Sequence, residues 1–328
     1  MKARTAARRS SAARAGTVQK RADKWASIAM SAVDDPQDHA LSLDQKDDTV
    51  DAMRQYVRDG RFSDSFMIGT NGGSTFESVL RPSTAELREV ALPSSSRKSP
   101  GPGLHSGADA QPRFLVKDTS IIPCRSVGLL KIITKNGEKR WGTAFLIGPR
   151  TLATAAHNLL HPKAGAADRI YVCLGYDGVR NTGEWHTTKG NRLSESWLEN
   201  PTSENPHDFA VLRIEDAEVG NQLGWFGFAD YSDEKFTNLA VNLFGYPIND
   251  EPRYSMHGST GRTFCGDTDR IYYDCDVEEG MSGGPVFAKY GDHRIAVGIH
   301  VAKDNDGPNV GTRIDSVVFK LLNEHKKW

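Results

Sequence analysis

From Phe114 onward the sequence is a succession of short apolar runs separated by turn-forming residues. Two of these runs, VGLLKIIT and RWGTAFLIG, flank KNGE, whose Asn136-Gly137 pair is a strong signal for a β-hairpin. Similar runs follow in TLATAA, RIYVCLG, FAVLRI, LAVNLFGY, RIYYDCDV, PVFAKY and RIAVGIHVA. Runs of this length and composition are typical of strands. We therefore expect an all-β barrel or sandwich over residues 113–328.

The two ends of the chain differ from this pattern. In the tail DSVVFKLLNEHKKW, apolar residues at helical spacing predict a C-terminal helix with Val317, Val318, Leu321 and Leu322 on its apolar face. Residues 1–112 begin with a basic, Ser- and Ala-rich stretch, which favours a solvated arm over a transit segment. The apolar run WASIAMSAV lacks a cleavage signature and is a weak signal-peptide candidate.

The segment Leu92–Arg113 is dominated by Pro, Gly and Ser, so we expect an exposed linker there. Its Arg97 and Lys98 suit a processing site. TVDAMRQYV, before it, is compatible with one short helix. We therefore predict a poorly structured N-terminal leader over residues 1–112, followed by one folded domain over residues 113–328.

Charge and cysteine content exclude several classes of partner. The net charge of −1 predicts neither a nucleic-acid partner nor a charged membrane surface. No apolar run approaches the roughly 18 residues of a membrane span. The four cysteines, Cys124, Cys173, Cys265 and Cys275, are too few for a disulfide scaffold and lack metal-ligand spacing, so no metal or other cofactor is expected. Buried free thiols and one or two bridges both stay open, with Cys265 and Cys275 closest in sequence.

The stretch EEGMSGGPVF places Ser282 among three glycines and matches G-x-S-x-G. In α/β-hydrolases that motif needs a helix directly after the serine, but here Gly283, Gly284 and Pro285 oppose one. That fold also needs its acid and its histidine after the serine, and the remaining chain is too short. We therefore set the α/β-hydrolase interpretation aside.

A second arrangement of the same chemistry needs the histidine and the acid before the serine. His157 ends a β-type run within TLATAAHNLL, and Asp208 stands at the start of an apolar strand in NPHDFAVLRI. Taken singly, each residue has an ordinary structural role: a strand-end histidine, a turn or cap aspartate, a turn serine. Together, in this order and these contexts, His157, Asp208 and Ser282 predict a catalytic triad.

The three contexts LATAAH, DFAVL and GMSGGPVF resemble the signatures of the chymotrypsin-like serine proteases. Within that superfamily, FLIGPRTLATAAHNLL, LFGYP, YYDCD, VGIHVA and the opening VKDTSIIPCRSVGLLKI resemble the glutamyl endopeptidases. The resemblance covers roughly residues 107–328. It implies two antiparallel six-stranded β-barrels, a C-terminal helix and peptide-bond hydrolysis. It also implies an oxyanion hole formed by the backbone N–H groups of Gly280 and Ser282, where a glycine allows angles that a Cβ forbids.

The resemblance further assigns the substrate pocket. His300 matches a histidine that in the family binds a glutamate side chain before the scissile bond. The alternative role for His300 is that of a structural strand histidine facing a polar edge. Val277 stands where many relatives carry a hydroxyl residue, and Glu278 and Glu279 could repel an acidic substrate. Val301, Ala302 and Lys303 are expected to pair with substrate backbone, with Asn309 to Thr312 as the pocket's far wall.

By the same resemblance, the leader would be an inhibitory or folding pro-segment of a zymogen, removed by an activating protease within Ser99 to Ala110. The alternative is a regulatory or partner-binding arm that stays attached. Asn158 stands where many relatives have a disulfide cysteine, so that bridge is not expected. Export to the extracellular space is favoured by resemblance alone. Polypeptides are the expected substrates, and the open alternatives are a different side-chain preference or a peptide-binding module without turnover.

Overall fold

The computed structural model describes residues 60–63, 67–69, 72–74 and 112–328, apart from 181, 216–217, 237, 267, 291–292 and 304–307. The basic start, the candidate signal segment, the short helix over TVDAMRQYV and the linker up to residue 111 lie outside the described residues. Their predicted roles, and the division of the chain at residue 112, stay predictions.

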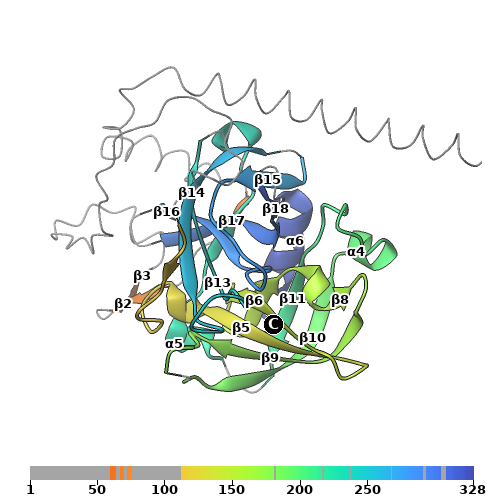
Figure 1. Ribbon diagram of the computed structural model, residues 1–328. Coiled ribbons are helices and arrows are strands. Elements are labelled where there is room, and N and C mark those ends of the chain that lie inside the picture. Colours follow the sequence, from red (N-terminus) through yellow and green to blue (C-terminus); the bar gives the residue numbers. More distant parts are fainter. Residues whose placement is uncertain are drawn as a thin grey trace, which may run out of the picture. The chain divides into compact units, whose positions relative to one another are not determined.

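The first half of the described domain is a closed antiparallel barrel of six strands. Its strands are β5 (Val127–Thr134), β6 (Lys139–Leu146), β7 (Thr151–Thr154), β9 (Gly165–Leu174), β10 (Trp185–Leu193) and β11 (Ala210–Ile214). They are arranged in the order β10, β11, β7, β6, β5, β9, and β9 pairs with β10 to close the barrel (Figure 1). The short β8 (Leu160–His161) pairs with β9. Apolar residues fill the interior, among them Leu130, Val172 and Leu212.

The predicted hairpin at Asn136-Gly137 joins β5 to β6. Gly137 has a φ of +81° and donates its N–H to the carbonyl of Thr134 at 2.9 Å. A positive φ strongly favours glycine, which explains this turn sequence.

The second half is another closed barrel of six antiparallel strands. They are β13 (Ala240–Gly245), β14 (His257–Gly266), β15 (Arg270–Tyr273), β16 (Pro285–Tyr290), β17 (His293–Ala302) and β18 (Asn309–Arg313). The ring runs β13, β14, β15, β18, β17, β16 and returns to β13. The two barrels predicted by resemblance are therefore confirmed.

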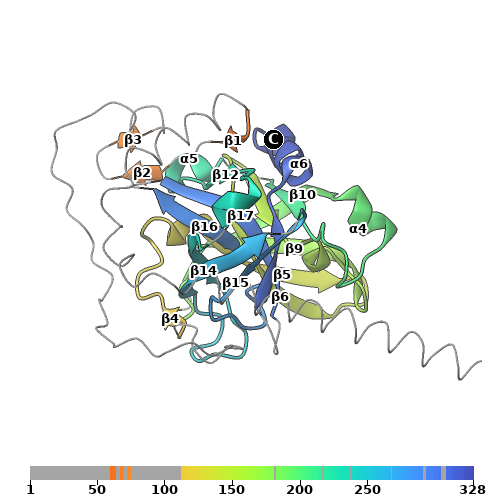
Figure 2. The same ribbon diagram turned by 90° about the horizontal axis from the view of Figure 1, so that it is seen from above.

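Three short strands extend the second barrel. β12 (Gly227–Ala229) lies parallel to β17, and β1 (Phe62–Ser63) pairs antiparallel with β12. β4 (Phe114–Leu115) pairs with β14, while β2 (Met67–Gly69) and β3 (Gly72–Ser74) form a separate hairpin (Figure 2). The strand β1 shows that one piece of the sequence assigned to the leader is built into the domain.

The helices of the described residues are few and short. They are η2 (Cys124–Ser126), η3 (Ala156–Asn158), α4 (Glu195–Glu199), α5 (Gly220–Leu223), η4 (Asp233–Phe236) and α6 (Ser316–His325). Asp315 caps α6 by accepting from the N–H groups of Val317 and Val318. The predicted helix is confirmed, but its buried residues are Val318, Phe319 and Leu322, and Val317 is 54% exposed. No helix among the described residues is long and apolar enough to cross a membrane.

An aromatic core lies where the two barrels meet. Phe145 of β6 packs edge-on against Phe226 at 5.4 Å between ring centroids, and Phe226 packs against Phe287 of β16 at 5.2 Å. All three rings are buried. Because aromatic rings bury large apolar areas, this contact holds the barrels in a fixed relation.

Three cysteines, Cys124, Cys173 and Cys275, are buried free thiols. A bridge between Cys265 and Cys275, which the sequence left open, is therefore absent. Burial raises the pKa of both Cys124 and Cys173 to about 12. These thiols are unreactive core residues.

Candidate active site

The pairing of β7 with β11 brings His157 and Asp208 together. Ala210 of β11 lies opposite Thr154 of β7, so the turn after β7 meets the residue just before β11. His157 Nδ1 lies 2.6 Å from one carboxylate oxygen of Asp208, and the backbone N–H of His157 donates to the other at 2.9 Å. Asp208 is only 5% exposed. A buried carboxylate in this place can fix the imidazole tautomer and stabilise its protonated form.

The loop between β15 and β16 carries Ser282 against the first barrel. The Ser282 carbonyl accepts from the N–H of Thr143 at 2.9 Å. It also accepts from the side-chain amide of Asn158, the residue after His157, at 3.0 Å. The Ser282 hydroxyl lies 3.4 Å from the carbonyl of Val301. The structure thus places the backbone of Ser282 beside the histidine's own turn, with its hydroxyl turned toward β17.

Gly283 shows how closely the chains approach there. Its φ is +91°, and a Cβ would lie 2.1 Å from the Thr143 carbonyl and 3.0 Å from the Ala155 nitrogen. Its N–H donates to the carbonyl of His300 at 2.7 Å. Only glycine fits, because both the conformation and the space exclude a side chain.

Between Glu279 and Gly284, two backbone N–H groups have no acceptor among the described residues. Four neighbours, Glu279, Met281, Gly283 and Gly284, all donate within the protein. Among the described residues, the N–H groups of Gly280 and Ser282 have no such partner. Gly280 has a φ of +97°, and a Cβ would lie 2.4 Å from the Tyr246 carbonyl. Unused donors on either side of one residue are what an oxyanion hole requires.

His300 lies beneath this loop as a buried, neutral imidazole. It is 2% exposed, and burial, followed by the neighbouring His157, lowers its pKa to about 3. Its Nδ1 is 2.6 Å from the hydroxyl of Tyr273, a residue that the sequence analysis did not single out. The tyrosine belonged to the predicted strand RIYYDCDV, but nothing local showed that its hydroxyl meets a histidine from β17.

The remaining predicted pocket residues lie at the end of β17, on β18 and in the loop before the serine. Val277 is buried, while Val301 is half-buried and Ala302 and Lys303 are exposed at the end of β17. Asn309 of β18 donates its side-chain amide to the Cys275 carbonyl at 2.5 Å, which joins the predicted far wall to the loop before the serine. Glu278 is not free to act alone, because its carboxylate lies 3.7 Å from both Lys303 and Arg113.

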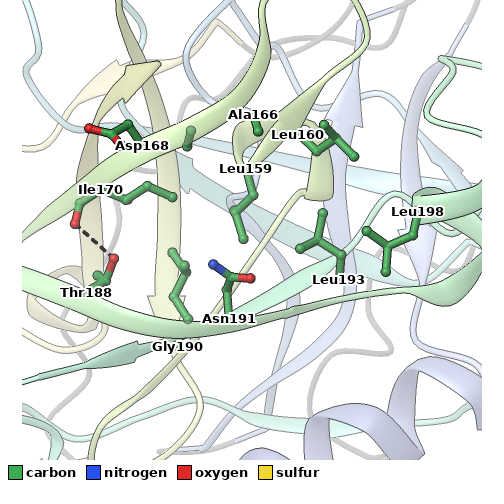
Figure 3. Close-up of a pocket in the computed structure, with 12 residues that line it drawn as sticks. Leu159, Leu160, Ala166, Asp168, Ile170, Thr188, Gly190, Asn191, Leu193 and Leu198 are labelled. Atoms are coloured by element: carbon green, nitrogen blue, oxygen red, sulfur yellow. Dashed lines mark hydrogen bonds between the residues drawn. The ribbon is translucent and has the colours of Figure 1, made fainter. Parts of the chain in front are cut away.

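Two other features could hold a ligand. His207, Asp269 and Asp315 form one cluster of possible metal-ligating groups among the described residues, with His207 Nε2 3.6 Å from Asp315 and 3.8 Å from Asp269. A pocket of about 220 Å³ lies beside β8, β9 and β10, lined by leucines that include Leu159 and Leu193 (Figure 3). None of the predicted site residues lines this pocket.

Comparisons with known proteins indicate a peptidase domain. Residues 142–299 match the trypsin-like peptidase domain. A protein named extracellular metalloprotease from Bacillus subtilis is 26% identical over 66% of this chain and 67% of its own length. A glutamyl endopeptidase from Bacillus licheniformis is 26% identical over 74% of this chain and 75% of its own length.

Solved structures show the same fold. A Glu endopeptidase in complex with MPD has a TM-score of 0.57 at 21% identity and covers 67% of this chain and 98% of its own. The thermostable serine protease AL20, from an extremophilic microorganism, has a TM-score of 0.51 at 20% identity, with 62% of this chain and 97% of its own covered. Two closed barrels and a peptidase-domain match across their junction identify residues 142–299 as a trypsin-like peptidase domain, on the fold of the chymotrypsin-like serine proteases.

Proposed function

We propose that this serine endopeptidase hydrolyses peptide bonds with His157, Asp208 and Ser282, preferring glutamate or aspartate before the scissile bond. The observation that carries the triad is the pair of hydrogen bonds from His157 to Asp208, on a turn that also holds the Ser282 carbonyl. His157 takes the proton of Ser282 as the hydroxyl attacks, and then gives it to the leaving amine. Asp208 stabilises the resulting imidazolium.

The Ser282 hydroxyl has to turn from the Val301 carbonyl toward His157 Nε2 for this chemistry. Such a turn is a rotation about χ1 between staggered positions, and a hydrogen bond at 3.4 Å opposes it only weakly. The developing oxyanion would then accept from the N–H groups of Gly280 and Ser282, each worth about 3 kcal/mol in the transition state.

The preference for an acidic side chain is supported by His300. A neutral imidazole can donate one N–H to a carboxylate, and desolvation of the site strengthens that hydrogen bond. The glutamyl endopeptidase from Bacillus licheniformis and the solved Glu endopeptidase are relatives whose names carry the same specificity. A different side-chain preference is the second candidate, because Val277 offers no hydroxyl at the pocket.

Labelling with a fluorophosphonate probe tests the nucleophile. The wild-type protein should be labelled and should cleave peptides, while Ser282→Ala should lose labelling and about a millionfold of turnover. Ser232→Ala is a matched control, since it removes a hydroxyl outside the site. Equal labelling of wild type and Ser282→Ala would refute the triad. Digestion of a peptide library tests the preference: most cleavages should follow Glu or Asp.

A further inference from the structure

Arg113 is bound by three carboxylates at the edge of the second barrel. Its guanidinium donates to both oxygens of Asp250 at 2.6 and 2.7 Å and to Asp276 at 2.8 Å. Its backbone N–H also donates to Asp276 at 3.0 Å, and Glu278 lies 3.7 Å away. This planar fork is the geometry that favours arginine over lysine for carboxylates. Hydrogen bonding to Arg113 also lowers the pKa of Asp250.

Two of these carboxylates belong to the neighbours of Val277, a residue of the candidate specificity pocket. Asp276 and Glu278 stand on either side of Val277, in the loop that leads to the unpaired N–H of Gly280. Glu278 also reaches Lys303 at 3.7 Å, at the end of the strand expected to pair with substrate. Glu278 therefore joins the loop before the nucleophile to the end of the strand expected to pair with substrate.

We propose that Arg113 is a positioning residue that sets the side-chain preference of the active site. Its positive charge neutralises Asp276 and Glu278, so that the pocket accepts an acidic substrate side chain. This inference rests on the proposed function and extends it to the charges around the pocket. Three carboxylates face two cations, Arg113 and Lys303. Without Arg113, Lys303 would be the one remaining strong cation among these contacts, and the excess negative charge would repel a substrate carboxylate.

The segment that carries Arg113 is held firmly enough for this role. The following residues form β4, which pairs with β14 through Phe114 opposite Gly258 and Leu115 opposite His257. Phe114 packs edge-on against Phe244 at 6.4 Å between ring centroids. A Cβ on Gly258 would lie 2.6 Å from the Phe114 ring, so this glycine leaves room for it. Arg113 thus directly precedes a paired strand, which fixes its backbone.

The test compares peptides that differ only in Glu or Gln before the scissile bond. Gln has nearly the shape of Glu without its charge, so the ratio of kcat/KM values for the two peptides isolates the electrostatic effect. Arg113→Gln should lower the Glu/Gln ratio roughly tenfold, the size expected for one unbalanced charge in a partly solvated site. Turnover of the Gln peptide should change by less than about threefold.

Charge rescue separates this role from a purely structural one. The double variant Arg113→Gln with Glu278→Gln should restore much of the ratio, and 1 M salt should restore part of it in Arg113→Gln. Arg169→Gln, an exposed arginine on β9 of the other barrel, makes the same change in net charge and should leave the ratio unchanged. An unchanged ratio in Arg113→Gln, or equal losses on both peptides without rescue, would overturn the proposal.

Failure of this inference differs from failure of the proposed function. A wild-type enzyme that cleaves Gln peptides as readily as Glu peptides would refute the preference itself, whereas Arg113 is tested by the change in the ratio. If Arg113→Gln does not fold, as a thermal melt would show, Glu278→Gln in the wild-type background takes its place. That variant should raise the Glu/Gln ratio severalfold, and no rise would overturn the proposal.

Discussion

Asn158 gives the sharpest test of how the two barrels share the nucleophile. The side chain is 2% exposed, and its amide nitrogen donates to the Thr154 hydroxyl and to the Ser282 carbonyl, both at 3.0 Å. Replacement by Ala removes two hydrogen bonds, each worth about 1 kcal/mol net. Neither acceptor is stranded, since Ser282 keeps the N–H of Thr143 at 2.9 Å and Thr154 still donates at 2.7 Å.

We therefore expect Asn158→Ala to lower the free energy of unfolding by about 2–3 kcal/mol, measured by urea denaturation. Asn158→Asp should cost more, because one carboxylate oxygen would face a carbonyl and a hydroxyl that already donates elsewhere. The kcat should fall several-fold in Asn158→Ala with KM nearly unchanged, since the Ser282 carbonyl loses one of its two anchors. An Asp variant as stable as wild type would refute this account.

Gly142 supplies a second variant for the same site. A Cβ there would lie 2.7 Å from both the nitrogen and the oxygen of the Asn158 amide. Gly142→Ala should therefore be destabilising alone, and less so when Asn158 is also Ala. A double-mutant cycle measures this coupling, which we expect to be at least about 1 kcal/mol. Additive losses would show that the contact is not the cause.

Three further predictions follow from individual residues. His300 stays neutral in the folded protein down to its pKa of about 3, whereas the unfolded chain binds a proton near pH 6.5. The free energy of unfolding should therefore fall as the pH drops from 6.5 toward 3, by up to about 1.4 kcal/mol per pH unit, and urea titrations should show a shallower slope in His300→Gln. Gly280→Ala should lower kcat by at least about a hundredfold, because a Cβ would lie 2.4 Å from the Tyr246 carbonyl and the oxyanion-hole N–H would move. A wild-type kcat for this variant in steady-state kinetics would contradict this prediction. Arg61 pairs with Asp230 at 3.1 Å beside β1. After limited cleavage within the predicted linker, the fragment that contains residues 60–63 should therefore stay bound to the domain on gel filtration. Arg61→Gln should weaken this binding.

Most strands of the two barrels could be predicted from apolar runs, whereas the polar barrel strands could not. β5 and β16 coincide with the predicted runs VGLLKIIT and PVFAKY. β10 is WHTTKGNRL, mostly exposed, and β14 begins with HGSTG, so neither presents an apolar run. Pairing with a neighbouring strand forms such strands, because a ladder satisfies backbone groups whatever the side chains are. A single sequence shows little of that long-range pairing.

The candidate site divides in the same way. His157, Asp208 and Ser282 lie in distinctive local contexts, so their residues could be named before any coordinates. Tyr273 and Arg113 have no local signal, because each acts on a partner far along the chain: His300 for the tyrosine, Asp250 for the arginine. Sequence patterns indicate which chemistry is present, and the fold determines which neighbours adjust its charge and orientation.

The tautomer of His300 links these neighbours to the proposed preference. A neutral imidazole has one N–H, and only the nitrogen that carries it can donate to a substrate carboxylate. The Tyr273 hydroxyl lies 2.6 Å from Nδ1 and 3.5 Å from the Val310 carbonyl, so the shorter contact is the stronger hydrogen bond. If the tyrosine donates to Nδ1, the proton of His300 must be on Nε2, which can then donate to a substrate carboxylate. Carboxylate recognition would then need no charged histidine: a hydrogen bond set by Tyr273 orients the acid, and Arg113 offsets the carboxylates that would repel it.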